Sequence, residues 1–137
     1  MTYKLNALDK LIEAVEAGDE DFIRGDAWVE AWQMFRPELD KMRSEGTASM
    51  IKAMRAYHGS LDAALALHEA LLPGWAHLVR SSSHGDGYNY RKGHFFSNVW
   101  RDDECPNNGA QCFDTWGATP ARAWLLAILR AYRSVQG

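Results

Sequence analysis

The stretch from Ser60 to Trp75, SLDAALALHEALLPGW, constrains the fold more than any other part of the chain. Ser60 stands where a helix N-cap is expected, because its hydroxyl can accept hydrogen bonds from the free amides of the first turn. Pro73 cannot continue a helix, and Gly74 allows the chain to turn. The stretch therefore predicts a helix over 61–72 that leads directly into a strand beginning at Trp75.

One face of this helix is expected to lie in the core. The face follows helical spacing and is rich in leucine. Its predicted members are Leu61, Ala64, Leu65, His68, Leu71 and Leu72. The alanines of the same helix are small and favour close packing against a sheet.

A second helix with clear boundaries is predicted near the C-terminus, in WGATPARAWLLAILRAYR. Thr119 is expected to cap it, and Pro120 occupies the first helical position, where its missing N–H costs nothing. From Ala121 to Tyr132, apolar residues recur at the spacing of one helix face. This helix, over 120–134, is long enough to cover one face of a small sheet.

Only the region between these two helices is typical of β-structure. Three short segments, 75–80, 94–100 and 112–116, are predicted strands, and the stretches between them are rich in turn residues. In the first segment the residues alternate, so that His77 and Leu78 face opposite sides. The region predicts a small antiparallel three-stranded sheet over about 75–116.

The N-terminal half is predicted to be helical. Apolar residues recur at helical spacing over 5–17, and 22–57 is interpreted as two or three short helices interrupted by Pro37 and Gly46. A chain of 137 residues has the size of one domain and can bury a core without disulfides. The predicted fold is therefore a single α+β domain over 1–137, with the sheet packed by helices.

An apolar stripe in the N-terminal half has two interpretations. Trp28, Trp32 and Phe35 follow one another at helical spacing, and Met42 continues the stripe. Such a stripe usually packs inside a domain. The alternative is a partner-binding surface, because Met and Trp are over-represented in adaptable interfaces. If these side chains are exposed in the monomer, the patch favours a homodimer or another partner.

Charge and terminal sequence limit the cellular setting. A net charge of −3 gives no attractive field toward nucleic acid or an anionic membrane. The N-terminus carries charges throughout, which predicts no secretory leader, and no apolar run reaches the roughly 20 residues of a membrane span. A cytoplasmic protein is expected, in which Cys105 and Cys112 stay reduced. Their pairing under oxidising conditions stays open.

The predicted hairpin loop over 81–93 brings cations and aromatic residues together at Tyr88, Tyr90, Arg91 and Lys92. This mixture is typical of surfaces that stack and neutralise single-stranded nucleic acid, and the hairpin would then bind through residues 80–101. The favoured interpretation is a soluble strand edge protected by charge. The same four residues are candidates for contact with a protein partner.

A metal site in the β region is a further hypothesis. Histidine and cysteine side chains of the kind that bind zinc occur there. They are His77, His84, His94, Cys105 and Cys112. No pair has the close spacing of a specific zinc motif, and the sequence holds neither a nucleotide-binding fingerprint nor a nucleophile elbow. We therefore expect no cofactor and assign no catalytic residue.

Several segments resemble one family of small phage and prophage proteins, the phage ABA sandwich domain. The matching words are ALDKLIEAVEAG (7–18), SLDAALALHEALLPGW (60–75), VWRDD (99–103) and WGATPARAWLLAILRA (116–131). The resemblance implies a small α/β sandwich encoded by phages, with no established activity to transfer. It also implies that 19–56, which does not match, is a variable helical insertion, and that 57–134 is an α-β-β-β-α core.

Together these observations predict a non-enzymatic phage accessory protein that binds a bacterial host protein in the host cytoplasm. Inhibition of a host defence complex, as by an anti-CRISPR protein, is the form of this hypothesis to test first. Two alternatives stay open: a metal-dependent enzyme using the His and Cys residues of the β region, and a single-stranded nucleic-acid binder.

Overall fold

The computed structural model describes residues 2–35, 45–79, 95–101 and 112–136 of the chain. Within these ranges it has six helices and three strands. In chain order they are α1 (Thr2–Ala17), α2 (Glu20–Arg24), α3 (Asp26–Phe35), α4 (Glu45–Tyr57), α5 (Leu61–Leu71), β1 (Trp75–Val79), β2 (Phe95–Arg101), β3 (Cys112–Gly117) and α6 (Pro120–Gln136).

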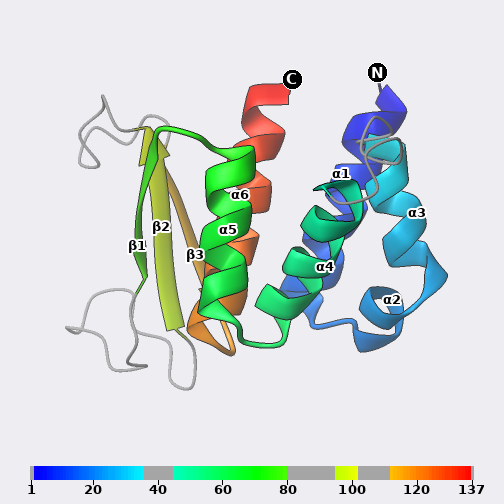
Figure 1. The fold of residues 1–137 in the computed structure, drawn as a ribbon, viewed down its shortest axis with the longest axis horizontal. Helices are drawn as coiled ribbons and strands as arrows, with labels where there is room; N and C mark the ends of the chain where they lie inside the picture. The colour runs from blue at the N-terminus through cyan, green and yellow to red at the C-terminus, as the bar shows by residue number, and fades with distance from the viewer. Residues whose placement is uncertain (1, 36–44, 80–94, 102–111, 137) are drawn as a thin grey trace.

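The strands form one antiparallel sheet in the order β1-β2-β3. His77 pairs with Val99, and Val99 pairs with Phe113 on its other side. The sheet makes one outer layer of the molecule, and the helices lie on a single side of it: α5 and α6 first, then α1 and α4, with α3 farthest away (Figure 1). The predicted α+β fold, with a three-stranded antiparallel sheet and a helical N-terminal half, is confirmed.

Helix α5 begins and ends as its sequence predicts. The Ser60 hydroxyl oxygen accepts a hydrogen bond from the Ala63 amide at 3.1 Å. After the helix, Gly74 adopts a φ of 85°, a left-handed conformation that a side chain would strain. The chain then enters β1 at Trp75.

The buried face of α5 differs from the prediction. Leu61 and Leu65 are 44% and 38% exposed, whereas Ala63 and Leu67 are buried. Because α5 packs against both α4 and α6, these neighbours select the buried arc. Ala64, His68, Leu71 and Leu72 are buried as predicted, but the buried arc is rotated around the helix away from Leu61 and Leu65.

Helix α6 is the centre of the fold. It contacts the sheet on one side and α1, α4 and α5 on the others. All seven residues from Ala123 to Leu129 are buried, which requires a segment that is apolar around its whole circumference. Thr119 caps the helix as predicted, since its hydroxyl oxygen accepts a hydrogen bond from the Arg122 amide at 3.0 Å.

Helix α6 approaches β3 closely at two points. The Thr115 hydroxyl donates a hydrogen bond to the Ala123 carbonyl at 2.5 Å. A Cβ atom added at Gly117 would lie 2.7 Å from the Ala123 nitrogen, closer than any real contact allows. The glycine therefore permits this approach, which holds the helix against the inner side of the sheet.

The N-terminal helices extend the same core. Helix α1 packs against α3 and α6, and α4 packs against α5 and α6. Trp28 and Trp32 of α3 are 1% and 3% exposed, and their ring centroids lie 5.9 Å apart in an edge-to-face arrangement. Buried side chains from α1 to α6 form one continuous cluster.

Candidate binding surface

The structure places two of the predicted partner-binding residues in the core. Trp28 and Trp32 are buried, so neither ring meets a partner unless the helices separate. Phe35 is the last residue of α3, but its side chain lies outside the part that is described. The remaining predicted contacts lie wholly outside the described residues: Met42, Tyr88, Tyr90, Arg91 and Lys92.

The predicted metal ligands are not brought together among the described side chains. His84, His94 and Cys105 lie outside the described ranges, and Cys112 is the first residue of β3, without a described side chain. Within the described part no group of three or more His, Cys, Asp or Glu side chains is arranged to hold a metal ion. His77 belongs to a different arrangement.

His77 stacks on an aromatic cluster between α5, β1 and α6. Its ring lies 4.4 Å from the Trp124 ring, centroid to centroid, and 4.9 Å from the His68 ring. His68 is 2% exposed, and its Nε2–H donates to the Trp75 carbonyl at 2.9 Å. The Trp124 Nε1–H donates to His68 Nδ1 at 3.2 Å.

These hydrogen bonds fix the charge state of His68. One ring nitrogen must donate and the other must accept, so the ring is neutral and in a single tautomer. Burial lowers the pKa of His68, and the hydrogen bond to the Trp75 carbonyl opposes the shift. Burial also lowers the pKa of His77, and the charge of Glu69 opposes that shift. With both nitrogens engaged, His68 serves the fold and is not available as a metal ligand or a base.

The opposite side of the sheet carries a different set of side chains. Residues of a strand alternate between faces, and Val99 and Thr115 are buried on the helix side. Their strand neighbours therefore face away from the helices. Six of these side chains, which we call the outer face, are Leu78, Phe96, Asn98, Trp100, Asp114 and Trp116.

The strand register aligns the outer face around a polar centre. Leu78 pairs with Asn98, and Asn98 pairs with Asp114, so the three form one row across the sheet. Phe96 pairs with Trp116 in the next row, where their ring centroids are 5.2 Å apart. Trp100 follows on the other side of Asn98, two residues further along β2.

The outer face is apolar and accessible at the same time. Leu78 is 45% exposed, slightly more than Leu61, Leu65 and Val135, the other exposed large hydrophobic residues described. Trp100 is partly exposed. No described helix lies over this side of the sheet (Figure 1). Aromatic residues beside an exposed leucine are typical of protein interfaces, where they act as anchors.

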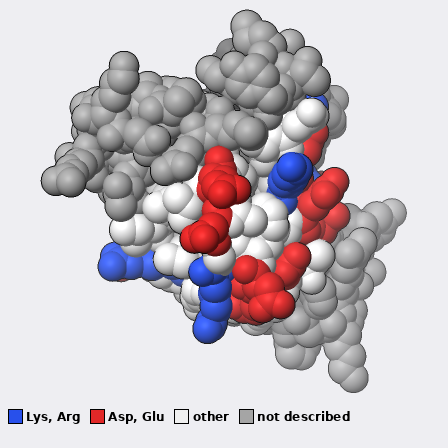
Figure 2. Space-filling view, turned by 90° about the vertical axis from the view of Figure 1, so that its right-hand side faces the viewer, with Lys and Arg blue, Asp and Glu red and all other residues white. Residues whose placement is uncertain are grey.

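The side of the molecule farthest from the sheet is charged. Figure 2 shows the side of the helices α1 to α3, where Asp and Glu side chains gather among fewer Lys and Arg side chains. The acidic residues of α2 and α3 are exposed there: Glu20, Asp21, Asp26 and Glu30. A charged surface of this kind is well solvated and offers few apolar anchors.

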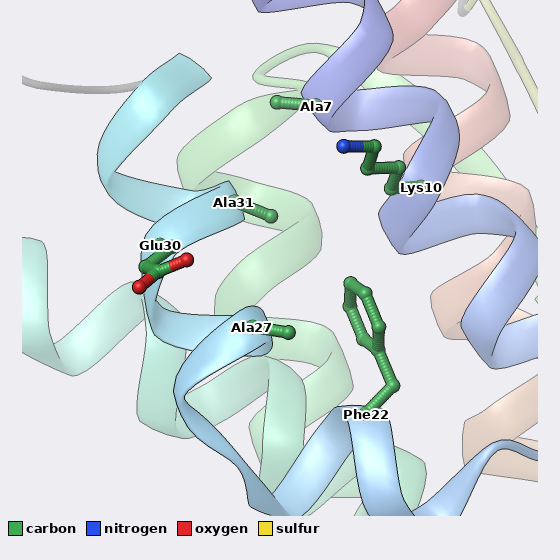
Figure 3. A pocket seen from close by; sticks show the side chains of 6 residues that line it. All are labelled: Ala7, Lys10, Phe22, Ala27, Glu30 and Ala31. Atoms are coloured by element: carbon green, nitrogen blue, oxygen red, sulfur yellow. The ribbon is translucent and has the colours of Figure 1, made fainter.

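A small pocket lies between α1, α2 and α3. Its volume is about 120 Å³, and alanine side chains with Phe22 form most of its wall (Figure 3). Lys10 and Glu30 stand at its sides. Ligand pockets usually span about 300–1,000 Å³, so this one is small for a metabolite. The outer face is the stronger candidate for function.

Comparison of the chain with models of protein families, with curated proteins and with solved structures finds no match in any of the three. The function therefore has to be argued from the outer face itself. Sequence reasoning placed Leu78 on the side opposite His77 but did not assemble the outer face. The signal available was the alternation in β2, where Phe96, Asn98 and Trp100 share one side.

Proposed function

We propose that this chain is a non-enzymatic binding protein whose outer face docks on a protein of a bacterial host. The observation that carries the proposal is Leu78, which is 45% exposed between neighbouring rows with aromatic side chains, on a sheet side free of described helices (Figure 1). Removing such an apolar surface from water is the main favourable term in protein association. An anchor of this composition suits a protein partner better than a small molecule.

The proposal includes a biological setting for this binding. The likeness of four sequence segments to phage ABA sandwich proteins supports a phage or prophage origin, and the host cytoplasm as the place of action. No helix among the described residues is long and apolar enough to cross a membrane. We infer that the partner belongs to a host defence complex and that binding inhibits it, as an anti-CRISPR protein does.

The binding step is tested by comparing two leucines of equal exposure. Leu78→Asp places a charge in the outer face, whereas Leu61→Asp places the same charge on α5, where Leu61 is 44% exposed. Each protein is immobilised and incubated with bacterial lysate. We expect a host protein that wild type and Leu61→Asp retain and Leu78→Asp loses. Equal retention by all three proteins would contradict docking through the outer face.

The defence step needs a separate assay. The chain is expressed in bacteria that carry an active CRISPR system, and the efficiency of phage plaquing is measured. Inhibition predicts more plaques with wild type than with Leu78→Asp. Full protection of the host by its defence system, whichever variant is expressed, would remove the anti-defence proposal and leave the binding proposal standing.

A further inference from the structure

The centre of the outer face is a polar pair with acceptors in excess. The Asn98 Nδ2 amide donates a hydrogen bond to Asp114 Oδ1. Asn98 Oδ1 is buried and accepts no hydrogen bond from any described group. Asp114 is exposed and forms no ion pair with the described residues. Asp114 thus presents the accessible carboxylate of the pair to donors from outside, whereas Asn98 Oδ1 lies below the surface.

Aromatic residues stand near the Asp114 carboxylate on the same side of the sheet. Phe96 and Trp100 stand two residues before and after Asn98 on β2, and Trp116 stands two residues after Asp114 on β3. Side chains that share one side of a strand are neighbours along it. A group bound at the carboxylate would therefore lie beside at least one ring.

A guanidinium group meets both requirements. It is planar, always charged and rich in N–H donors, so it can pair with a carboxylate while its plane stacks on an aromatic ring. A lysine ammonium has the charge without the plane. A nucleic-acid strand has bases that stack, but its phosphates would be repelled by the Asp114 carboxylate and by the net charge of −3.

From this complementarity we infer that the outer face binds an arginine side chain of its protein partner, with the guanidinium paired to Asp114 and stacked on a neighbouring tryptophan. The inference rests on the proposed function and names the chemistry of the partner segment. Leu78, beside Asn98 in the same row, contacts the apolar part of that segment.

The recognition can be measured with small probes before the partner is known. The probes are the N-acetyl amides of arginine, of citrulline, which has the same shape without the charge, and of lysine. Indole N–H signals of Trp100 and Trp116 are followed by NMR during titration. We expect saturable shifts at one or both signals with the arginine probe, and much weaker ones with citrulline and lysine. Equal shifts with citrulline, or none with arginine, would overturn the inference.

Asp114→Asn tests the carboxylate directly. The variant keeps the shape of the side chain and an acceptor for the Asn98 amide, so the sheet is expected to fold as in wild type. We expect it to weaken binding of the arginine probe by up to about 5-fold, the upper end of the range for an exposed charge pair. Glu13→Gln, which removes one exposed charge on α1, is the matched control and leaves the affinity unchanged. Equal affinity in Asp114→Asn and wild type would contradict the assignment.

The proposed protein docking and the arginine inference have separate contradicting outcomes. If Leu78→Asp loses the captured protein while Asp114→Asn retains it and wild type ignores the arginine probe, protein docking stands and the arginine inference falls. If capture is the same in all variants, the proposed function falls. If a single-stranded oligonucleotide binds and the arginine probe does not, the outer face is a nucleic-acid-binding surface and the inference falls. If the protein self-associates and Asp114→Asn abolishes this, the partner is a second copy of the chain.

Discussion

Replacing His68 by phenylalanine tests the hydrogen-bonded link between α5, β1 and α6. Phenylalanine keeps a ring in the site but removes both nitrogens. The indole of Trp124, a residue that is only 4% exposed, then loses the acceptor of its Nε1–H, and the hydrogen bond from the His68 ring to the Trp75 carbonyl is lost. An unsatisfied buried donor costs about 1–3 kcal/mol and a lost hydrogen bond about 1 kcal/mol, so His68→Phe should lower the free energy of unfolding by about 2–4 kcal/mol at pH 7.5.

The same substitution should flatten the pH dependence of stability. Because burial lowers the pKa of His68 in the folded state, the unfolded chain binds more protons below about pH 6.5, the ordinary histidine value. The free energy of unfolding therefore falls as the pH drops, by at most about 1.4 kcal/mol per pH unit for one histidine. Between pH 6.5 and 5.0 this amounts to at most about 2 kcal/mol.

Urea unfolding followed by circular dichroism at pH 7.5 and 5.0 measures both effects. The quantity of interest is the stability difference between wild type and His68→Phe, since carboxylates contribute equally to both proteins. That difference should shrink as the pH falls. His58→Gln, at an exposed histidine after α4, is the control for the removal of one histidine. A His68→Phe protein as stable as wild type, with the same pH dependence, would show that the His68 hydrogen bonds do not hold α5, β1 and α6 together.

Three further substitutions test how the helices are held. Ser60→Ala removes the N-cap of α5 and should lower the free energy of unfolding by about 1 kcal/mol in urea unfolding. Gly117→Ala pushes a Cβ atom against the Ala123 backbone and should cost about 1–3 kcal/mol, measured in the same way. Arg122→Ala removes a guanidinium that lies 3.9 Å from the centre of the Tyr57 ring and donates to the Tyr57 carbonyl, and should cost about 1.5–3 kcal/mol by thermal and urea unfolding.

Arg24→Ala is the control that distinguishes loss of the Arg122 contact with Tyr57 from loss of one positive charge. Arg24 pairs with Glu20 four residues earlier on α2, and both side chains are largely exposed. Arg24→Ala should change the free energy of unfolding by less than about 0.5 kcal/mol. If Arg24→Ala and Arg122→Ala destabilise the protein equally, the contact between α6 and Tyr57 does not have the assigned role. Likewise, a Gly117→Ala protein with wild-type stability would show that β3 and α6 tolerate greater separation.

The sequence predicts those parts of the fold that depend on local chemistry. Ser60 and Thr119 mark helix starts because a capping hydroxyl acts within its own turn, and Gly74 marks the turn into β1. The choice of buried face is different. Leu61 and Leu65 have the right spacing for the core, but α4 and α6 contact the helix along the neighbouring arc, so tertiary packing decides.

The candidate surface was harder to predict for a related reason. Alternation separates His77 from Leu78 within one strand, but a surface that spans three strands also requires their register. Register follows from the hydrophobic pattern and the turn geometry. The segments between the strands, 80–94 and 102–111, are too long for a short turn to fix it. The row that joins Leu78, Asn98 and Asp114 therefore emerges only from the structure.

Trp28 and Trp32 were candidates for a binding surface, but they lie in the core. The helical spacing of Trp28 and Trp32 is compatible with a core and with a binding surface, and sequence spacing alone does not distinguish the two. Their burial between α1 and α3 places them in the core. Most of the aromatic residues that remain partly exposed in the described part belong to the sheet, with Phe22 and Tyr132 on helices, which moves the search for a partner toward β1, β2 and β3.

Photo-crosslinking in bacterial cells tests whether the outer face contacts a host protein. A photoreactive amino acid replaces either Leu78 on the outer face or Leu61 on α5, two positions of nearly equal exposure. Docking through the outer face predicts a discrete adduct with a host protein from position 78 and none from position 61. Adducts of equal yield from both positions, or an adduct from position 61 alone, would contradict docking through the outer face of the sheet.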